Sequence, residues 1–408
     1  MKKITKCRIS KEETLIDILS LGEQSLTGVF PKNKDEKITK GPLELVWATN
    51  SGLLQLKHSY DLDEMYGDNY GYRSGLNTSM ISHLRNKIKW LEKLVFLSKE
   101  DLVIDIGSND ATALKAFSGN HKKLGIDPTG NKFLEFYIDG IELIADFFSR
   151  EVLRKKYPNK KAKIITSIAM FYDLEDPIKF VNDVYDSLDD KGIWHFEQSY
   201  MPLMLKTNAY DTICHEHLEY YSLEVVNNIL ERCKMRIIDV QTNSINGGSF
   251  AVTACKINSD FTSLSPLVDW MIFQEKQLEL NTIKPYISFK ERIFKHRDSL
   301  KYLLDSLIEN GKKVLGYGAS TKGNVLLQFC NITSKQIPYI AEVNSYKYGR
   351  FTPGTQIPII SEEAAKKMKP DYFLVLPWHF KDNILSREKE FINNGGKFIF
   401  PLPEIEII

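Results

Sequence analysis

Apolar runs of strand length alternate with helix-like stretches over most of the chain. Between residue 101 and about residue 256 the strand-like runs are DLVIDIG, KKLGID, GIELIADFF, AKIITSIAMF, GIWHFEQ, MRIIDVQ and GGSFAVTACK. After Gly311 the alternation restarts with KKVLGYG, IPYIAEV, YFLVLPW and GKFIFPLP. Because strands that alternate with helices are typical of doubly wound α/β units, we expect a larger unit of this class followed by a smaller one.

Helical periodicity marks two further segments. A helix is predicted within residues 76–98 from apolar residues that share one helical face: Met80, Leu84, Ile88, Leu91 and Val95. A lysine-rich helical stretch covers about residues 265–310, and Gly311 stands where a helix C-cap glycine belongs.

The N-terminal part has a different pattern. Residues 1–75 show short apolar runs and turn signals with little helical periodicity, which predicts a small, strand-poor lobe. The expected domains are therefore an N-terminal lobe (1–75), a central domain (76–260), a helical connector (261–310) and a C-terminal Rossmann-like lobe (311–408).

The composition limits the class of protein. The 408 residues correspond to two or three cores at roughly 100 to 200 residues per domain. Lys and Arg number 54 against 53 Asp and Glu, giving a formal net charge of +1. The chain as a whole therefore has no basic field, and neither nucleic acid nor an anionic membrane is indicated as a partner. A hydrophobic content of 43% predicts a chain that is folded almost throughout.

The cysteines and the N-terminus bear on location. Five cysteines, odd in number and far apart, fit a reducing compartment better than a disulfide scaffold. No apolar h-region follows the basic N-terminus, and no stretch approaches about 18 uninterrupted apolar residues. We expect a cytoplasmic protein with neither a signal peptide nor a membrane span.

A glycine loop follows the first strand of the central domain. Asp105 and Gly107 end that strand, and Asp127 ends the next one, 20 positions after the glycine. This order is typical of Rossmann-type sites, in which the second acid binds ribose hydroxyls. However, Gly107 is followed by Ser108, Asn109 and Asp110 rather than by further glycines, and an acid there would repel a pyrophosphate. Carboxylates instead suit the ammonium and sulfonium of S-adenosylmethionine. The alternative is that these acids are solvated strand-end caps.

After the third strand, Asp146 and Phe147 offer a polar group and an aromatic face where an adenine could lie. Core packing is the alternative for this pair.

The segment 210–221 concentrates groups suited to proton transfer. It contains His215, Glu216 and His217 among further acids and tyrosines, and Ser222 is placed to cap the following helix. A histidine beside a carboxylate is equipped for general acid–base work. The two histidines could instead bind a metal, although HExxH spacing is absent, or could be structural.

At this segment the chain resembles the sugar C-methyltransferases that act on nucleotide-linked 4-keto-deoxysugars. The resemblance covers nearly the whole chain in collinear blocks: LSLGEQSLTGVF, SGLLQL, DNYGYRSGLN, DIGSND, YDTICHEHLEYYSL, NGGSFAV, GYGASTKGN, KYGRFTPGTQIPI and PDYFLVLPWHFKDNI. It implies an N-terminal zinc-binding lobe, a central class I methyltransferase domain that binds S-adenosylmethionine, and a C-terminal lobe that helps to hold the sugar nucleotide.

The resemblance also implies roles for individual residues. A carbon next to a ketone becomes nucleophilic when its proton is removed, so a base and a donor for the enolate oxygen are required. We expect His217 to be the base, with Glu216 orienting it or sharing the proton. Tyr72 and Tyr70 are expected to donate to the oxyanion. His215 and Cys214 remain further catalytic candidates, although Cys214 could equally be a small filler.

Three departures from the family pattern accompany this assignment. The two CxxC pairs of the zinc lobe read Cys7–Ser10 and Ala48–Ser51 here, so zinc is not expected and no metal ligand is assigned. Cys214 replaces a tyrosine that precedes the HEH motif. The loop Ser167–Asp173 lacks the family's histidine, which leaves the methylated carbon open.

A second glycine loop, GYGASTKGN, begins the C-terminal lobe. Alone it would indicate a nicotinamide dinucleotide, but by resemblance it is expected to receive the diphosphate of the sugar nucleotide. The expected substrate-binding residues are Tyr317, Ser320, Lys322, Asn324, Lys347 and Arg350, with Trp378 as a stacking surface. Surface charges on a structural lobe are the alternative.

We therefore expect an S-adenosylmethionine-dependent C-methyltransferase that works through an enolate of a nucleotide-linked keto-deoxysugar, as a monomer or homodimer. The alternatives are an O- or N-methyltransferase on the same kind of substrate, an NAD-dependent sugar-nucleotide dehydrogenase, and a non-catalytic binding protein.

Overall fold

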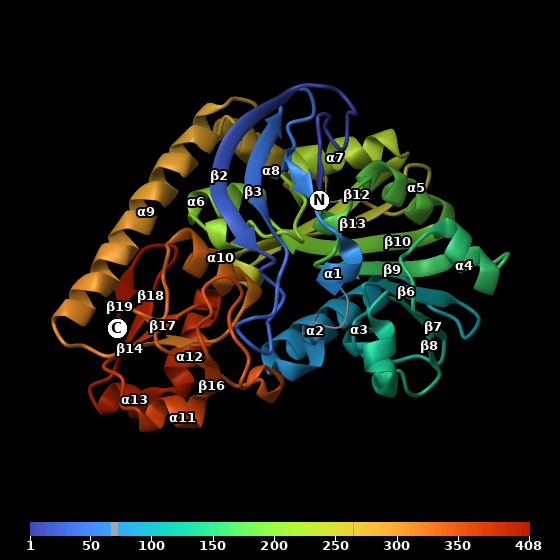
Figure 1. Cartoon of the computed structure of the whole chain (residues 1–408). Coiled ribbons are helices and arrows are strands. Elements are labelled where there is room, and N and C mark those ends of the chain that lie inside the picture. Colours follow the sequence, from blue (N-terminus) through green and yellow to red (C-terminus); the bar gives the residue numbers. More distant parts are fainter. Residues whose placement is uncertain (67–71, 264) are drawn as a thin grey trace.

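The computed structural model describes residues 1–66, 72–263 and 265–408. Its larger sheets have seven, four and six strands, and a further sheet pairs β1 (Lys2–Lys3) with β5 (His58–Ser59). Figure 1 shows the N-terminal strands in blue at the top, the central sheet in teal and green, and the C-terminal sheet in red.

The seven-stranded central sheet has the order β12-β13-β10-β9-β6-β7-β8. All neighbouring strands are parallel except β13, which is antiparallel to β10 and β12. This order is that of class I methyltransferases, so the predicted fold class is confirmed. The strand order reverses between β6 and β9, where open α/β sheets bind their ligands. The bounds are β6 (Leu102–Ile106), β7 (Lys122–Ile126), β8 (Ile141–Ile144), β9 (Ala162–Ile168), β10 (Leu188–Ser199), β12 (Met235–Asn243) and β13 (Ser249–Lys256).

Both faces of the central sheet are covered. Val103 of β6 shares one core with Leu91 of α2, whereas its neighbour Ile104 shares the other core with Val226 of α7. Successive strand residues point to opposite faces, so a strand buried on both sides is apolar throughout. The helices and 3-10 turns of this region are η1 (Ser74–Leu76), α2 (Thr78–Leu94), α3 (Thr112–Lys115), η2 (Gly130–Phe136), α4 (Arg150–Lys156), η3 (Phe171–Asp173), α5 (Pro177–Ser187), α6 (Met201–Lys206), η4 (Tyr210–Thr212), α7 (Leu223–Arg232) and η5 (Ile245–Gly247).

The four-stranded N-terminal sheet has the order β11-β4-β3-β2. Three of its strands come from the first 56 residues, but β11 (Glu219–Tyr220) belongs to the segment that carries the HEH motif. The other bounds are β2 (Leu15–Ser25), β3 (Lys40–Ala48) and β4 (Leu54–Leu56), followed by α1 (Leu62–Tyr66). A motif of the central domain is thus built into the sheet of another lobe.

The prediction of a strand-poor N-terminal lobe is wrong, because β2 has 11 residues and β3 has 9. Their pairing shifts register after Asp17 and again between Ser20 and Glu23, and Gly22 has a φ of +82°. Such irregularities break the alternation of buried and exposed residues by which a strand is recognised.

The six-stranded C-terminal sheet has the order β16-β15-β14-β17-β18-β19, with only β19 antiparallel to its neighbour. This is the Rossmann strand order, and its reversal lies between β14 and β17. The bounds are β14 (Val314–Tyr317), α10 (Thr321–Phe329), β15 (Ile340–Glu342), η6 (Ser345–Lys347), β16 (Ile359–Ser361), α11 (Glu362–Lys367), β17 (Tyr372–Val375), η7 (Trp378–Phe380), α12 (Lys381–Arg387), α13 (Lys389–Asn393), β18 (Lys397–Phe400) and β19 (Glu406–Ile407).

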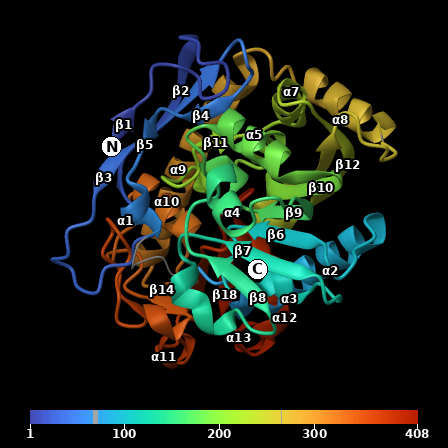
Figure 2. The ribbon, with the colours of Figure 1, turned by 90° about the vertical axis from the view of Figure 1, so that its right-hand side faces the viewer.

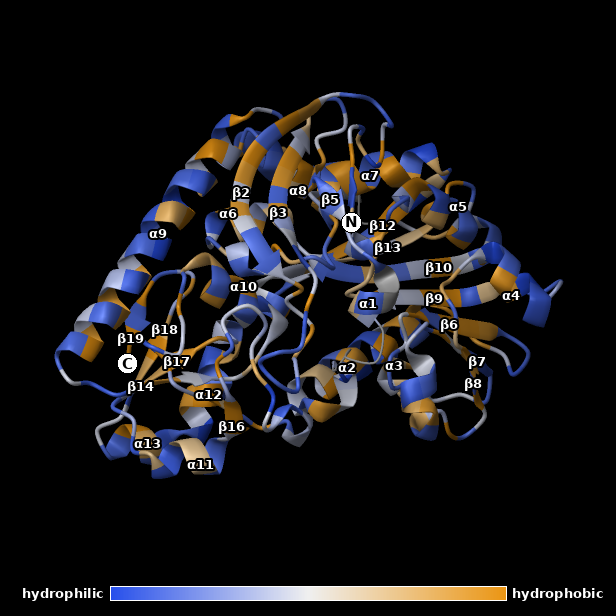
Figure 3. Ribbon diagram, in the orientation of Figure 1, coloured by the Kyte–Doolittle hydropathy of each residue, from blue (hydrophilic) through white to orange (hydrophobic). Residues whose placement is uncertain are grey.

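Two helices connect these sheets, α8 (Ser265–Gln277) and α9 (Lys284–Glu309). Gly311 follows α9 with a φ of +70°, which confirms the predicted C-cap glycine. Figure 3 shows largely apolar strands in the central and C-terminal sheets, and α9 with alternating polar and apolar turns. Among the described residues, no helix combines the length and the apolar character needed to cross a membrane.

The segment from Ser25 to Phe30 is attached to the C-terminal lobe by side chain-to-backbone hydrogen bonds. Ser25 exchanges two such bonds with Gln328, at 2.8 and 3.2 Å. The Asn324 amide donates to the Thr27 carbonyl at 2.7 Å, and Arg350 donates to the Phe30 carbonyl at 3.0 Å. Figures 1 and 2 show the blue N-terminal strands next to α10, in agreement with these contacts.

We predict that Asn324→Ala lowers the free energy of unfolding by about 1–3 kcal/mol, because the buried Thr27 carbonyl loses its donor. Denaturant titration followed by tryptophan fluorescence measures this change. Asn228→Ala, the same substitution at an exposed position of α7, serves as the control and should change stability by less than about 0.5 kcal/mol. Equal midpoints for the two variants would contradict the contribution of this bond.

Candidate active site

The glycine loop after β6 lies at the point where the central sheet reverses its order. Gly107 has a φ of +72°, and a Cβ at this position would approach Met170 Cγ to 3.3 Å. The backbone N–H of Asn109 donates to Asp127 Oδ2 at 2.7 Å. The structure therefore brings Gly107, Asn109 and Asp127 together at the reversal point, beside the loop that follows β9.

Asp105 is 4% exposed and accepts a 2.5 Å hydrogen bond from the Thr166 hydroxyl. Burial raises the pKa of Asp105 to about 7, and the nearby charge of Asp127 adds to the rise. Two carboxyl groups in a poorly solvated place favour a cationic ligand. These carboxylate acceptors fit S-adenosylmethionine, whose ammonium would lie near Asp105 and whose ribose hydroxyls would lie near Asp127.

Asp146 and Phe147 follow β8, the next strand along the same edge. The Phe147 ring is 45% exposed, while the neighbouring Phe148 packs on Phe180 with ring centroids 5.4 Å apart. Core packing therefore describes Phe148 and not Phe147. A role for Phe147 against an adenine stays a prediction.

His217 is held in one tautomer. Its Nδ1 lies 2.8 Å from the Thr212 carbonyl oxygen, so Nδ1 donates and Nε2 keeps a lone pair. Burial, followed by the charge of Lys322, lowers the pKa of His217 to about 3. The ring packs on Tyr172 with centroids 4.2 Å apart. His217 is thus a neutral imidazole with one nitrogen available as a proton acceptor.

The structure separates His215 from His217. His215 is fully buried with Nε2 3.5 Å from the Gly41 carbonyl, and the edge of the Tyr60 ring is against it at 4.6 Å between centroids. Burial lowers the pKa of His215 to about 4. These contacts place it at the N-terminal lobe.

Glu216 and Cys214 lie in the interior beside the loop. Burial raises the pKa of Glu216 and raises that of Cys214 well above its usual range. Glu216 Oε1 would lie 2.3 Å from a Cβ at Gly28, so the N-terminal lobe reaches the HEH motif at a glycine. Cys214 is 1% exposed within a hydrophobic core, in keeping with a filler.

Tyr72 and Tyr70 are the expected donors to the enolate oxygen, and Tyr72 is among the described residues. Tyr72 is 51% exposed, and its carbonyl accepts from Asn109 Nδ2 at 3.1 Å, so it lies at the cofactor loop. Tyr70 lies outside the described residues.

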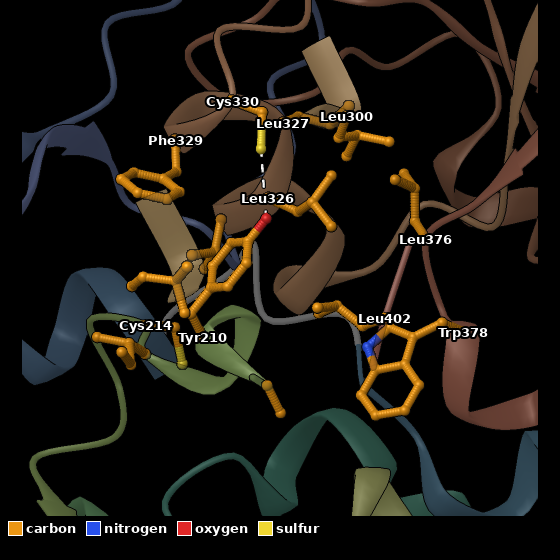
Figure 4. Close-up of a cluster of buried hydrophobic side chains, with 14 of the residues drawn as sticks. Tyr210, Cys214, Leu300, Leu326, Leu327, Phe329, Cys330, Leu376, Trp378 and Leu402 are labelled. Atoms are coloured by element: carbon orange, nitrogen blue, oxygen red, sulfur yellow. Dashed lines mark hydrogen bonds between the residues drawn. The ribbon is translucent and has the colours of Figure 1, made fainter. Parts of the chain in front are cut away.

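Residues 210–221, called the reactive segment below, contact the C-terminal lobe through η4. The Trp378 indole N–H donates to Asp211 Oδ2 at 2.8 Å, and Lys322 Nζ donates to the Asn246 carbonyl at 2.6 Å. Figure 4 shows Tyr210 and Trp378 among leucines of the C-terminal lobe, with the Tyr210 hydroxyl 3.3 Å from Cys330 Sγ. The charge of Lys322 influences both His217 and Asp211. This lysine of α10 therefore lies close enough to the reactive segment to act on it by its charge.

The other predicted substrate residues use their polar groups within the protein. Tyr317 is 2% exposed with its hydroxyl 2.9 Å from Glu388, and Ser320 caps α10. Asn324 and Arg350 hold the N-terminal segment, as described above. Lys347 donates to the Ala319 carbonyl at 2.7 Å. The structure does not bring these groups together into one anion site.

Glu342, which the sequence analysis missed, ends β15 and accepts the Ala319 N–H at 2.8 Å. A carboxylate at the glycine turn opposes a diphosphate in the same place. Rossmann sites carry an acid at the end of the second strand, so the position of Glu342 at the end of β15 could have identified it from the sequence.

A second cluster missed by the sequence analysis joins α2 to the end of β10. Glu197 is 2% exposed and accepts from His83 at 2.6 Å, Lys87 at 2.7 Å and Asn243 at 2.9 Å. Burial opposes ionisation, but the His83 bond and the Lys87 charge outweigh it and lower the pKa of Glu197 to about 2. His83 and Lys87 are four residues apart on the buried side of α2. Two polar residues at this spacing on a buried helix face are the sequence signal that could have identified the cluster.

Several buried polar atoms at the junction of the lobes have no hydrogen-bond partner within the described part of the chain. They are Asp211 Oδ1, Thr212 Oγ1, Glu216 Oε2 and His379 Nδ1. Unpaired buried polar groups are costly and occur where a ligand or water completes the bonding. The junction is therefore suited to a polar substrate.

Comparison with known proteins gives matches at both ends of the chain. A family model described as "Putative zinc binding domain" matches residues 7–66, and one described as "C-methyltransferase C-terminal domain" matches residues 244–403. The C-methyltransferase NovU of Streptomyces niveus is 31% identical over 100% of this chain and 98% of its own length.

Solved structures with a related fold cover about half of the chain. The magnesium protoporphyrin IX methyltransferase ChlM of Synechocystis PCC 6803 is 14% identical with a TM-score of 0.35, covering 47% of this chain and 90% of its own. An S-adenosylmethionine-dependent methyltransferase of Clostridium acetobutylicum is 13% identical with a TM-score of 0.32, covering 44% and 92%. The fold assignment depends on the sheet order of this chain.

The full-length match to NovU and the C-methyltransferase model over the C-terminal lobe agree with the class I sheet and with the reactive segment placed against it. The chain belongs to the C-methyltransferase family.

Proposed function

We propose that this C-methyltransferase transfers the methyl group of S-adenosylmethionine to a carbon next to the ketone of a nucleotide-linked keto-deoxysugar. The observation that carries the proposal is the fixed tautomer of His217, whose Nδ1 donates to the Thr212 carbonyl and whose Nε2 remains a proton acceptor. When bound, S-adenosylmethionine supplies an electrophilic methyl group. Every other requirement of the reaction falls on the residues of the chain.

The first requirement is removal of the proton from the carbon next to the ketone. His217 Nε2 accepts that proton, and the electron pair of the C–H bond moves into the enolate. Because burial and Lys322 keep His217 neutral, no proton must be lost from the imidazole before it acts. A neutral imidazole with so low a pKa is a weak base, so the enolate needs strong stabilisation in the same step.

The second requirement is a donor for the enolate oxygen. Lys322 is a cation beside the reactive segment, where it donates to the Asn246 carbonyl at 2.6 Å. We propose that its ammonium group stabilises the developing negative charge, in place of the phosphate contact expected from the sequence. Tyr72, at the cofactor loop, remains a second candidate donor.

The nucleotide part of the substrate is assigned to the C-terminal lobe. Its Rossmann strand order and the acid Glu342 at the end of β15 support a ribose near that carboxylate. Arg350 and Lys347 of the same lobe donate to carbonyl groups of the protein, so no residue is assigned to the diphosphate. The family membership disfavours the three alternatives, which are heteroatom methylation, hydride transfer and non-catalytic binding.

We predict that the enzyme exchanges deuterium from solvent into the carbon next to the ketone before any methyl donor is added. With donor present, the product should gain one methylene in mass, and NMR should place the new methyl group on a ring carbon. Incubation with a panel of keto-deoxysugar nucleotides followed by mass spectrometry and NMR makes both measurements. A methyl group found on oxygen or nitrogen would refute the proposal.

Replacing His217 by Gln tests the base. We predict that turnover falls by about 10²- to 10⁴-fold, the usual contribution of a positioned base. Affinity for S-adenosylmethionine, measured by calorimetry, should not change, since the cofactor residues lie on the central sheet. His121→Gln, a buried histidine outside the reactive segment, is the matched control. Unchanged turnover in His217→Gln would mean that another group takes the proton.

The ionisation of Asp105 predicts a pH dependence of cofactor binding. Its folded-state pKa of about 7 lies above the usual value of 3.8 for an aspartate, so it loses its proton as the pH rises through about 7. Affinity for the cationic cofactor should therefore rise by up to about tenfold between pH 6 and pH 8. Between pH 4 and about 7 the unfolded chain binds fewer protons, so the ligand-free protein should lose stability as the pH rises.

Calorimetry across this pH range checks the binding prediction, and Asp105→Asn should give a flat profile. A profile of the same slope in Asp105→Asn would assign the titration to another group.

A further inference from the structure

Arg8 is buried in the N-terminal lobe, where the matching family model is described as zinc-binding. It is 3% exposed, although arginine is seldom fully buried without partners. The turn that contains it is held by hydrogen bonds, since Cys7 Sγ accepts from the Ile9 N–H at 3.4 Å and lies 3.1 Å from the Ser51 hydroxyl.

The residues at this turn do not fit zinc. Structural zinc sites use four thiolate or imidazole ligands, whereas the side chains beside Cys7 are those of Ser51 and Gln55. No group of three or more His, Cys, Asp or Glu side chains with metal-binding geometry occurs in the described ranges 1–66, 72–263 and 265–408. Something other than a metal must connect the turn to the sheet.

The guanidinium group of Arg8 makes that connection. Nη1 donates to the Leu56 carbonyl at 2.6 Å and to Gln55 Oε1 at 3.4 Å, and Nη2 donates to the Ser59 hydroxyl at 2.9 Å. A planar fork with five donors can join several acceptors in fixed directions, much as a metal joins its ligands. The turn is thereby attached to β4 and β5.

The other edge of the guanidinium faces the reactive segment. Arg8 Nε lies 3.6 Å from Glu219 Oε1, and the Glu219 side chain is fully buried. Glu219 is two residues after His217 and pairs with Gln55 across the β11–β4 ladder. Burial raises the pKa of Glu219, and the charge of Arg8 opposes the rise. One cation is therefore shared between the N-terminal sheet and the strand that follows the proposed base.

We propose that Arg8 replaces a structural metal in this lobe and acts as a positioning residue that fixes the reactive segment, and through it His217, on the N-terminal sheet. Its effect on turnover rests on the proposed role of His217, whereas its effects on local protection and metal content do not.

Hydrogen–deuterium exchange of Arg8→Met tests the attachment. Peptides covering residues 214–222 should exchange at least about tenfold faster than in the wild type, because β11 opens more often. The matched control is Lys6→Met, in the same turn, whose side chain is 57% exposed in a pair with Glu13. Lys6→Met should leave these peptides unchanged, and Arg8→Lys, which keeps the charge, should restore part of the protection. Equal exchange in Arg8→Met and Lys6→Met would overturn the proposal.

Metal analysis of the wild-type protein tests the replacement. We expect far less than one zinc per chain by plasma mass spectrometry, and no change in exchange after dialysis against a chelator. One zinc per chain whose removal releases residues 214–222 would overturn the proposal.

Turnover separates positioning from general stability. Arg8→Met should lower kcat by about 10- to 100-fold with the KM for S-adenosylmethionine unchanged, since a misplaced group acts on the chemical step. Arg8→Lys should recover part of kcat. A loss confined to KM would overturn the positioning role. If no sugar nucleotide is methylated, the proposed function fails, while exchange and metal content still decide the role of Arg8.

Glu219→Gln keeps the test decisive if Arg8→Met does not fold. This variant removes the closer of the two carboxylates that pair with Arg8 Nε, the other being that of Glu175 at 3.8 Å, and should release the same peptides. Unchanged exchange in Glu219→Gln would overturn the proposal.

Discussion

The pairing of β11 with β4 is the constraint on which the geometry of the site depends. Leu56 N–H donates to the Leu218 carbonyl at 2.8 Å, and Leu218 N–H donates to the Tyr172 carbonyl at 2.7 Å. The residue directly after His217 is thus held by the N-terminal sheet on one side and by the central domain on the other. Because backbone hydrogen bonds fix position as well as direction, the imidazole has little freedom to turn. The N-terminal lobe therefore helps to determine where the proposed base points.

Groups of opposite charge lie on the two sides of the β11–β4 pairing. Asp105 and Asp127 stand at the end of the central sheet, where a cationic donor fits, and Lys322 stands on the other lobe, where an enolate would develop. Each group is largely removed from water, so its field is weakly screened. A net charge of +1 over the whole chain is compatible with this arrangement, because the signs are separated locally and balance overall. The methyl group would move between a region that favours positive charge and one that favours negative charge.

The parts of the structure that were predicted from the sequence are those set by local rules. The helix that contains Leu91 follows from periodicity, Gly311 from the conformation that ends a helix, and Asp127 from its place at a strand end. Asn324 was assigned to the substrate but holds a carbonyl 297 positions away. No local pattern distinguishes these two uses of one amide. Lys322 was likewise assigned to a phosphate, because its sequence neighbours form a glycine loop while its spatial neighbours come from other lobes.

The close approach of Gly28 to Glu216 shows how tightly the three lobes are fitted. A Cβ at Gly28 would lie 2.3 Å from Glu216 Oε1 and 3.7 Å from Thr321 Oγ1, so residues from all three lobes meet at one point. Interiors are close-packed, and a contact of this kind transmits a shift in one lobe to the others. The base comes from the central domain, its orientation from the N-terminal sheet and its cationic neighbour Lys322 from the C-terminal lobe. The proposed site therefore exists only when the three lobes are docked, and polar side chains such as Asn324 help to hold the lobes together.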